Sequence, residues 1–121
     1  MINGYDRLGF RAGASALVLG AGTVGLLWAQ LLAGSPAGVV LQTELSAFRR
    51  GQAEALGVDH VFDGAAADLP EQIRAVCPDG VDFIVDATGE PAAVQQGIGL
   101  LAKGGTFLIF GVCPAGSDIR V

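Results

Sequence analysis

Three glycines stand where a phosphate-binding turn needs them, in the stretch Gly20-Ala-Gly-Thr-Val-Gly25, between two apolar segments. In a G-x-G-x-x-G turn, Gly20 would permit the tight turn, Gly22 would let a pyrophosphate approach the backbone, and Gly25 would let the next helix pack closely. That helix would begin at Thr23 and offer unpaired N–H groups and its positive dipole end to the phosphates. In a chain with 19 glycines, the spacing alone is weak evidence for a phosphate-binding turn. The elements and residues around the motif must support that interpretation.

An acidic residue follows the turn at the distance expected of a ribose-binding residue. Glu44 lies about 20 residues after the motif, at the end of the next predicted strand. A carboxylate there can accept both ribose hydroxyls of an adenosine and would repel a 2′-phosphate, which favours NAD over NADP. Arg49 keeps NADP open, because a guanidinium can pair with a phosphate. The alternative is that Glu44 only caps a solvated strand end and the glycines form a structural turn.

Strands and helices alternate along the whole chain. The predicted strands are 15–20, 39–43, 60–62, 81–86 and 106–110, and the predicted helices are 23–33, 46–55, 69–76 and 91–101. On the first helix, the spacing of Val24, Leu27, Trp28 and Leu31 predicts the buried face. Short connections between alternating elements imply right-handed crossovers. The sequence therefore predicts an α/β fold, an open, doubly wound parallel sheet of about five strands with helices on both faces.

Composition argues against several classes of partner. The net charge is −5, and the only adjacent basic pair is Arg49-Arg50, so no electrostatic footprint for nucleic acid is present. No apolar run reaches the roughly 18 to 20 residues of a membrane span, and the N-terminus lacks a secretory signal pattern. We therefore expect no membrane partner and a cytoplasmic location.

The chain is poor in metal ligands. Cys77 and Cys113 lie far apart, each before a proline, and are interpreted as reduced packing residues. His60 is the one histidine, at a strand start, and is interpreted as a surface or hydrogen-bonded residue rather than a catalytic one. We therefore expect no ordinary zinc site within this chain.

The sequence resembles the cofactor-binding domain of the medium-chain, zinc-type alcohol and polyol dehydrogenases over nearly its whole length. The similar stretches are GASALVLGAGTVGLLWAQLL, VVLQTELSAFRRGQAEALGVDHVFD and VDFIVDATGEPAAVQQGIGLLAKGGTFLIFGV. Two shorter stretches, Glu-Leu-Ser-Ala-x-Arg and Ala-Leu-Gly-Val-Asp, are similar to sorbitol and threonine dehydrogenases in particular. The resemblance implies a Rossmann-like fold and a partial dinucleotide-binding domain over residues 1–121. The activity it implies is hydride transfer between an alcohol and NAD.

The same resemblance implies roles for individual residues. Glu44 would take the ribose hydroxyls, Arg49 would approach the same ribose, Val24 would lie behind the nicotinamide ring, Thr88 and Gly89 would line the adenosine side, and Gly111 with Val112 would face the nicotinamide. Two alternatives stay open: Val24 as plain helix core, and Thr88 as a turn hydroxyl that satisfies its own backbone. Trp28 is interpreted as core. Asp82 and Asp86 share one strand face and are interpreted as solvated strand ends rather than an acid–base pair.

In the family, a second domain holds the catalytic zinc, and the sixth strand completes the sheet; neither is found in this sequence. The resemblance thus implies a truncated module with no catalytic residue, which binds a dinucleotide without turnover when alone. The other expected partners are the missing catalytic domain or a second copy, joined through the apolar edge strand 106–110. The alternatives are a stand-alone, non-catalytic dinucleotide-binding or sensor module and, more weakly, an interaction domain whose glycine turn binds nothing.

Overall fold

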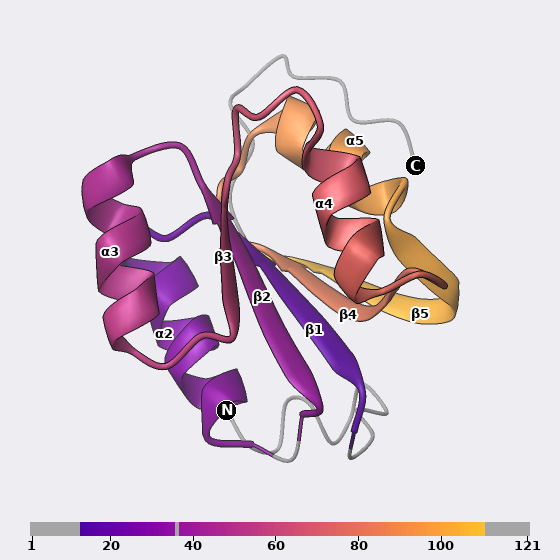
Figure 1. Ribbon diagram of the computed structural model, residues 1–121, viewed down its shortest axis with the longest axis horizontal. Helices are drawn as coiled ribbons and strands as arrows, with labels where there is room; N and C mark the ends of the chain where they lie inside the picture. The colour runs from indigo at the N-terminus through magenta and orange to yellow at the C-terminus, as the bar shows by residue number, and fades with distance from the viewer. Residues whose placement is uncertain (1–12, 36, 111–121) are drawn as a thin grey trace.

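One parallel sheet forms the centre of the computed structural model, which describes residues 13–35 and 37–110 (Figure 1). In this part of the chain the strands are β1 (Ser15–Leu19), β2 (Val39–Glu44), β3 (His60–Asp63), β4 (Val81–Asp86) and β5 (Leu101–Ile109). Their order is β3-β2-β1-β4-β5, and all neighbours pair in parallel. The predicted Rossmann-like, doubly wound α/β fold is confirmed.

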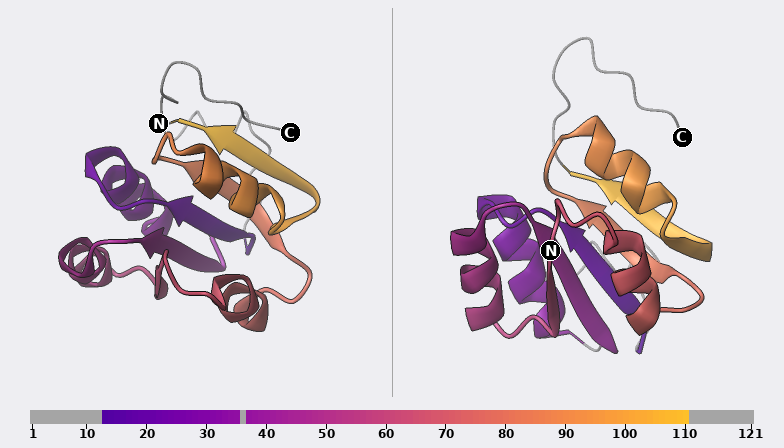
Figure 2. Two further views of the ribbon diagram at one scale, coloured as in Figure 1. Left: turned by 90° about the horizontal axis from the view of Figure 1, so that it is seen from above. Right: turned by 45° about the horizontal axis from the view of Figure 1, so that its top comes forward.

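Helices cover both faces of this sheet. They are α2 (Thr23–Ala33), α3 (Ala47–Ala55), α4 (Leu69–Val76) and α5 (Pro91–Ile98). The helices α2 and α3 lie on one side, and α4 and α5 lie on the other (Figure 2). Two separate apolar clusters result, one under each helix pair. This two-sided burial explains why β1 consists of five buried residues with apolar side chains on both faces.

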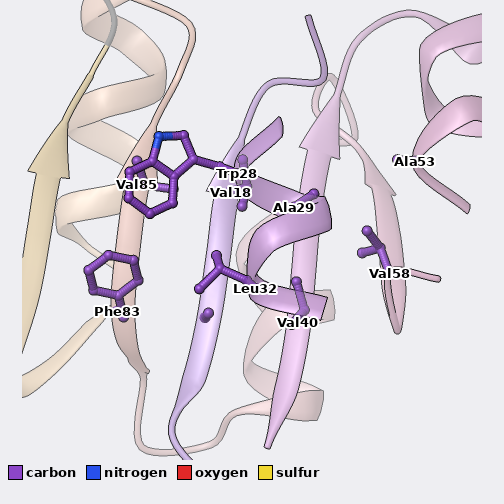
Figure 3. Packing of buried hydrophobic residues seen from close by; sticks show 10 residues of the cluster. Val18, Trp28, Ala29, Leu32, Val40, Ala53, Val58, Phe83 and Val85 are labelled. Atoms are coloured by element: carbon purple, nitrogen blue, oxygen red, sulfur yellow. The ribbon is translucent and has the colours of Figure 1, made fainter. Parts of the chain in front are cut away.

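The buried face of α2 differs from the predicted one. The buried residues are Gly25, Trp28, Ala29 and Leu32. Val24 is 40% exposed and Leu27 is 53% exposed. Nearly every residue of this helix is apolar, so its periodicity has little contrast, and the close packing of Gly25 sets the rotation instead. Trp28 is 2% exposed, as expected of core, and lies beside Phe83 with ring centroids 6.2 Å apart (Figure 3).

The segment between α5 and β5 was also predicted wrongly. The helix ends at Ile98, and the strand starts at Leu101 rather than at Thr106. The expected turn at 103–105 lies inside β5, where the register with β4 shifts. Gly104 has a φ of +77°, which the irregularity requires, and a Cβ on Gly105 would lie 2.8 Å from the Asp82 carbonyl oxygen. The two glycines therefore form an irregularity within the strand instead of a turn before it.

Across residues 13–35 and 37–110, the structure contains no helix with the length and apolar character needed to cross a membrane.

The corrected face of α2 predicts an asymmetry between two adjacent residues. Trp28→Ala would lower the free energy of unfolding by about 3–5 kcal/mol, because it leaves a large cavity under the helix. Leu27→Ala, the matched control on the exposed side, would change it by about 0.5 kcal/mol or less. Urea unfolding followed by circular dichroism measures both. Equal losses for the two variants would contradict the observed face.

Candidate functional site

A cavity of about 600 Å³ lies at the carboxyl ends of the central strands. Its lining comes from the turns after β1 and β4, from the end of β2 with the residue that follows it, from Arg49 of α3, from Gly64 after β3, and from α5. The lining residues are Gly20, Gly22, Thr43, Glu44, Leu45, Arg49, Gly64, Ala87, Thr88, Glu90, Ala92, Ala93 and Gln96. The strand order changes direction between β1 and β4. In open α/β sheets this switch point is where ligands bind, and the volume is in the range of small-molecule sites.

The three glycines of the motif after β1 lie in three different environments. Gly20 has a φ of +96°, and a Cβ there would lie 2.8 Å from Thr88 Cγ2. A Cβ on Gly25 would lie 2.3 Å from the Gly20 carbonyl oxygen, so α2 packs backbone to backbone against the turn. Gly22 has nothing within 4 Å of its Cβ position and borders the cavity. The open space that a pyrophosphate needs therefore lies at Gly22.

The start of α2 also faces this space. Gly22 is the N-cap residue, with no side-chain cap, and the first helical hydrogen bond runs from Leu26 N–H to the Gly22 carbonyl at 2.9 Å. The N–H groups of the first helical turn therefore have no hydrogen-bond acceptor within the helix. Such groups, with the helix dipole behind them, favour an anion.

Glu44 ties the glycine turn to the end of β2. Its Oε1 accepts a hydrogen bond from Ala21 N–H at 2.8 Å, and its Oε2 accepts one from Ser46 N–H at 2.9 Å. The half-buried carboxylate also lines the cavity. Each carboxylate oxygen keeps a second lone pair. Glu44 therefore caps the end of β2, as the alternative interpretation predicts. The same carboxylate can still accept hydrogen bonds from the hydroxyl groups of a ligand.

The two adjacent arginines have different surroundings. Arg50 Nη1 donates to the carbonyl oxygens of Glu44 at 3.0 Å and Leu45 at 2.9 Å, and lies 3.5 Å from Asp63 Oδ1. Arg49 is exposed and lines the cavity. Arg50 therefore holds the corner after β2, while Arg49 is placed for a ligand.

The turn after β4 is organised by a buried carboxylate. Asp86 is 0% exposed. Its Oδ1 accepts from Thr88 N–H at 3.0 Å and from Thr88 Oγ1–H at 2.6 Å, and its Oδ2 accepts from Gly89 N–H at 3.2 Å. The predicted solvation of Asp86 is wrong, because these donors replace water. The Thr88 hydroxyl oxygen also accepts a hydrogen bond from Glu90 N–H at 2.9 Å, so the alternative for Thr88, a turn hydroxyl that satisfies its own backbone, is confirmed.

Asp82, at the opposite end of β4, is half-buried, so its predicted solvation is correct only in part. Its Oδ2 accepts hydrogen bonds from Ser15 N–H at 3.0 Å and from Ser15 Oγ–H at 3.2 Å. Asp82 therefore fastens β1 to β4 at the amino ends of these strands. It takes no part in the cavity.

The structure brings together only part of the predicted site. Gly20, Gly22, Glu44, Arg49 and Thr88 line the cavity. Thr23, Val24, Gly25 and Gly89 are not in that lining. The first three belong to the first turn of α2, and Gly89 belongs to the turn after β4. The alternative of plain helix core for Val24 is wrong, because its side chain is 40% exposed. Gly111 and Val112 lie outside the described residues.

Sequence reasoning missed two kinds of residue. The small residues Ala92 and Ala93 of α5 line the cavity, and nothing in their type signals a ligand. Gln42 is 0% exposed in the middle of β2, and a polar residue in a strand buried on both faces was a usable signal. Asp86 and Thr88 have the spacing of a turn in which an aspartate bonds to the backbone two residues on, which was also readable.

The described cysteine and histidine stay outside this site. Cys77 is a buried free thiol, as expected of a packing residue, and burial raises the pKa of that thiol. His60 is exposed and stacks on Phe62, with ring centroids 6.1 Å apart. Cys113 lies outside the described residues. Within the part of the chain that the structure describes, no three His, Cys, Asp or Glu residues are grouped to hold a metal ion.

A comparison with known proteins agrees with the fold. The model of the family described as "Zinc-binding dehydrogenase" matches residues 23–121. The chain therefore belongs to the zinc-binding dehydrogenase family.

Individual relatives extend this result. The chain is 32% identical over 108 residues to an L-threonine 3-dehydrogenase of Rhizobium etli, a match that covers 88% of this chain and 31% of the relative. A solved structure of a candidate zinc-binding dehydrogenase from Sinorhizobium meliloti 1021, bound to NADP, is 33% identical with a TM-score of 0.90, over 99% of this chain and 36% of that one. The 2R,3R-butanediol dehydrogenase of Bacillus subtilis is 31% identical with a TM-score of 0.82, over 92% and 32% of the two chains. The chain thus spans about a third of the length of the relatives it matches.

The contact between α2 and the turn predicts opposite effects for two helical glycines. Gly25→Ala would lower the free energy of unfolding by about 1–3 kcal/mol, because its methyl group meets the Gly20 carbonyl. Gly51→Ala in α3, where nothing lies within 4 Å, would raise it by about 0.5–1 kcal/mol through helix propensity. Thermal unfolding of both variants checks this. Stabilisation by Gly25→Ala would contradict the observed backbone contact.

Proposed function

We propose that residues 1–121 form the dinucleotide-binding part of a zinc-type dehydrogenase, which transfers a hydride between an alcohol or polyol and NAD. The observation that carries the proposal is the open space at Gly22, at the start of α2 and on the border of the cavity. A glycine there leaves room for a pyrophosphate beside the first helical N–H groups, which have no partner within the helix. The NADP bound to the Sinorhizobium meliloti relative supports the same class of ligand.

Different residues of the cavity would bind different parts of the dinucleotide. The N–H groups around Gly22 would bind the pyrophosphate, and Glu44 would accept the adenosine ribose hydroxyls on its remaining lone pairs. The turn built on Asp86 would present Thr88 and Ala87 as the opposite wall. When bound, the nicotinamide supplies the hydride acceptor. Val24, at the helix start, would lie on the nicotinamide side.

The identity of the dinucleotide depends on two side chains at the end of β2. The Glu44 carboxylate, held by two N–H groups, would lie close to a 2′-phosphate and repel it, which favours NAD. Arg49 lines the same cavity and would pair with a 2′-phosphate, which favours NADP. We propose NAD because the carboxylate is fixed in place, whereas the Arg49 guanidinium is exposed and screened by solvent.

The preference predicts a result for Glu44→Ala. The unchanged chain would bind NAD and ADP-ribose alike and NADP about tenfold more weakly, which corresponds to about 1.4 kcal/mol. Glu44→Ala would bring NAD and NADP to within about twofold, because the repulsion is gone. Calorimetric titration measures all three ligands.

Glu90→Ala serves as the control, because this carboxylate lines the same cavity from the other side. It would leave the preference for NAD in place. Tighter binding of NADP by the unchanged chain, lost on Arg49→Ala, would show that Arg49 and not Glu44 decides the cofactor.

Catalysis would need more polypeptide than this chain. The relatives are about three times longer, and in such enzymes a zinc ion polarises the alcohol oxygen. We propose that the zinc ligands and the substrate pocket belong to that other polypeptide, and that this chain by itself binds without turnover. We also propose that β5, the last strand in the order of the described strands, pairs with that polypeptide or with a second copy.

The edge proposal predicts self-association of the isolated chain. Ile109 is 44% exposed on β5, and Ile109→Lys would shift the chain from dimer to monomer at micromolar concentration, because a charge blocks edge pairing. Phe48→Lys is the control, since Phe48 is 76% exposed on α3, away from this edge. Sedimentation velocity distinguishes the species. A monodisperse monomer of the unchanged chain would refute pairing between copies.

A further inference from the structure

A buried amide lies behind the glycine turn. Gln42 is 0% exposed and is paired in register with Val18 of β1. Val18 is in turn paired with Val85 of β4, and Val85 with Leu108 of β5. The row that crosses the sheet under α2 is therefore apolar except at Gln42. An amide at such a place is costly unless it makes hydrogen bonds that the apolar residues cannot make.

The amide bonds to the backbone on both sides of the turn. Gln42 Nε2 donates to the Gly20 carbonyl oxygen at 2.7 Å and lies 3.3 Å from the Gly25 carbonyl oxygen. Its Oε1 is buried and has no partner among the described residues. One side chain thus joins Gly20, the first residue of the turn, to the first turn of the helix that follows.

The close packing of α2 creates the need for this donor. Because Gly25 lies against the Gly20 carbonyl, that oxygen is enclosed between the helix and the sheet. A buried carbonyl without a donor is unfavourable. Gln42 supplies the donor from the sheet side, and its bond fixes the direction of the Gly20 peptide group, which carries the N–H of Ala21. Glu44 accepts that N–H, so Gln42 and Glu44 hold one peptide group from its two ends.

We propose that Gln42 is a positioning residue for the pyrophosphate of the dinucleotide, although it does not line the cavity. It would act by holding the turn and the first N–H groups of α2 in the direction that the phosphates need. The inference rests on the proposed dinucleotide function. It predicts that loss of the Gln42 amide weakens binding of the pyrophosphate part of the ligand and spares the adenosine part.

The first experiment separates these two parts of the ligand. Gln42→Met keeps the volume and removes the donor, and its binding of ADP-ribose and of adenosine is followed by NMR titration. ADP-ribose would bind about tenfold more weakly than to the unchanged chain, in line with one lost hydrogen bond, and adenosine would bind within about twofold. Leu41→Met is the control, because Leu41 is the adjacent buried residue of β2 and packs on the α4 face.

The second experiment restores the donor with a proton. In Gln42→Glu, a neutral carboxyl group can donate its O–H to the Gly20 carbonyl, whereas a carboxylate cannot donate and would repel that oxygen. ADP-ribose affinity of this variant, divided by that of the unchanged chain at each pH, would therefore rise as the pH falls from 8 to 5.5. The division removes the pH effects that the variant shares with the unchanged chain. Gln42→Met would show no such rise.

The outcomes are distinct. Binding of ADP-ribose by the unchanged chain with undiminished binding by Gln42→Met would overturn the positioning role and leave the proposed function standing. Equal loss of adenosine and ADP-ribose would reduce Gln42 to a structural residue, as would a Gln42→Glu variant that binds ADP-ribose no better than Gln42→Met at any pH between 8 and 5.5. Absence of ADP-ribose binding by the unchanged chain would overturn the proposed function and this inference with it.

Discussion

The backbone contact between Gly25 and the Gly20 carbonyl is the constraint on which the rest of the molecule depends. It requires glycine at position 25 and brings α2 against the sheet at one rotation. That rotation buries Trp28 and Leu32 and leaves Val24 and Leu27 on the outside. It also places Gly22 and the helix start at the cavity. The fold and the site are therefore consequences of the same contact.

The walls of the cavity are mainly backbone turns, held in place by side chains. Glu44 fastens the turn after β1 to the end of β2, and Asp86 fastens the turn after β4. Arg50 holds the next corner through two carbonyl oxygens. Groups held in this way lose little freedom when a ligand binds, which lowers the cost of association. The sheet thus acts as the rigid base for three preorganised turns.

Most of the fold could be predicted from the sequence, because the signals were local. The bounds of α2, α4 and β4 follow directly from apolar runs and from flanking glycine and proline. The face of α2 could not be predicted, since an almost uniformly apolar helix has no periodic contrast. The start of β5 was missed because a glycine pair signals a turn and an irregular strand equally well.

The site was only partly readable for a related reason. The glycine motif and Glu44 are recognised by their spacing along the chain, and both were predicted from the sequence. Arg49 was also predicted and lies in the cavity lining, and the donors to Asp86 come from Thr88 and Gly89 of its own turn, a local pattern that was missed. The role of Gln42 required knowing that α2 encloses the Gly20 carbonyl. Tertiary contacts of this kind leave no pattern in a single sequence.

The burial of Trp28 has a spectroscopic consequence. It is the one tryptophan of the chain, and its ring meets Phe110 edge to face at a centroid distance of 5.5 Å. Phe110 lies just after β5 and is 49% exposed, so it forms the outer side of the indole's enclosure. Tryptophan fluorescence therefore comes from a single, apolar environment, one side of which is formed by an exposed ring. Any protein or ligand that displaces the end of β5 would change the emission wavelength, which makes the chain its own optical reporter.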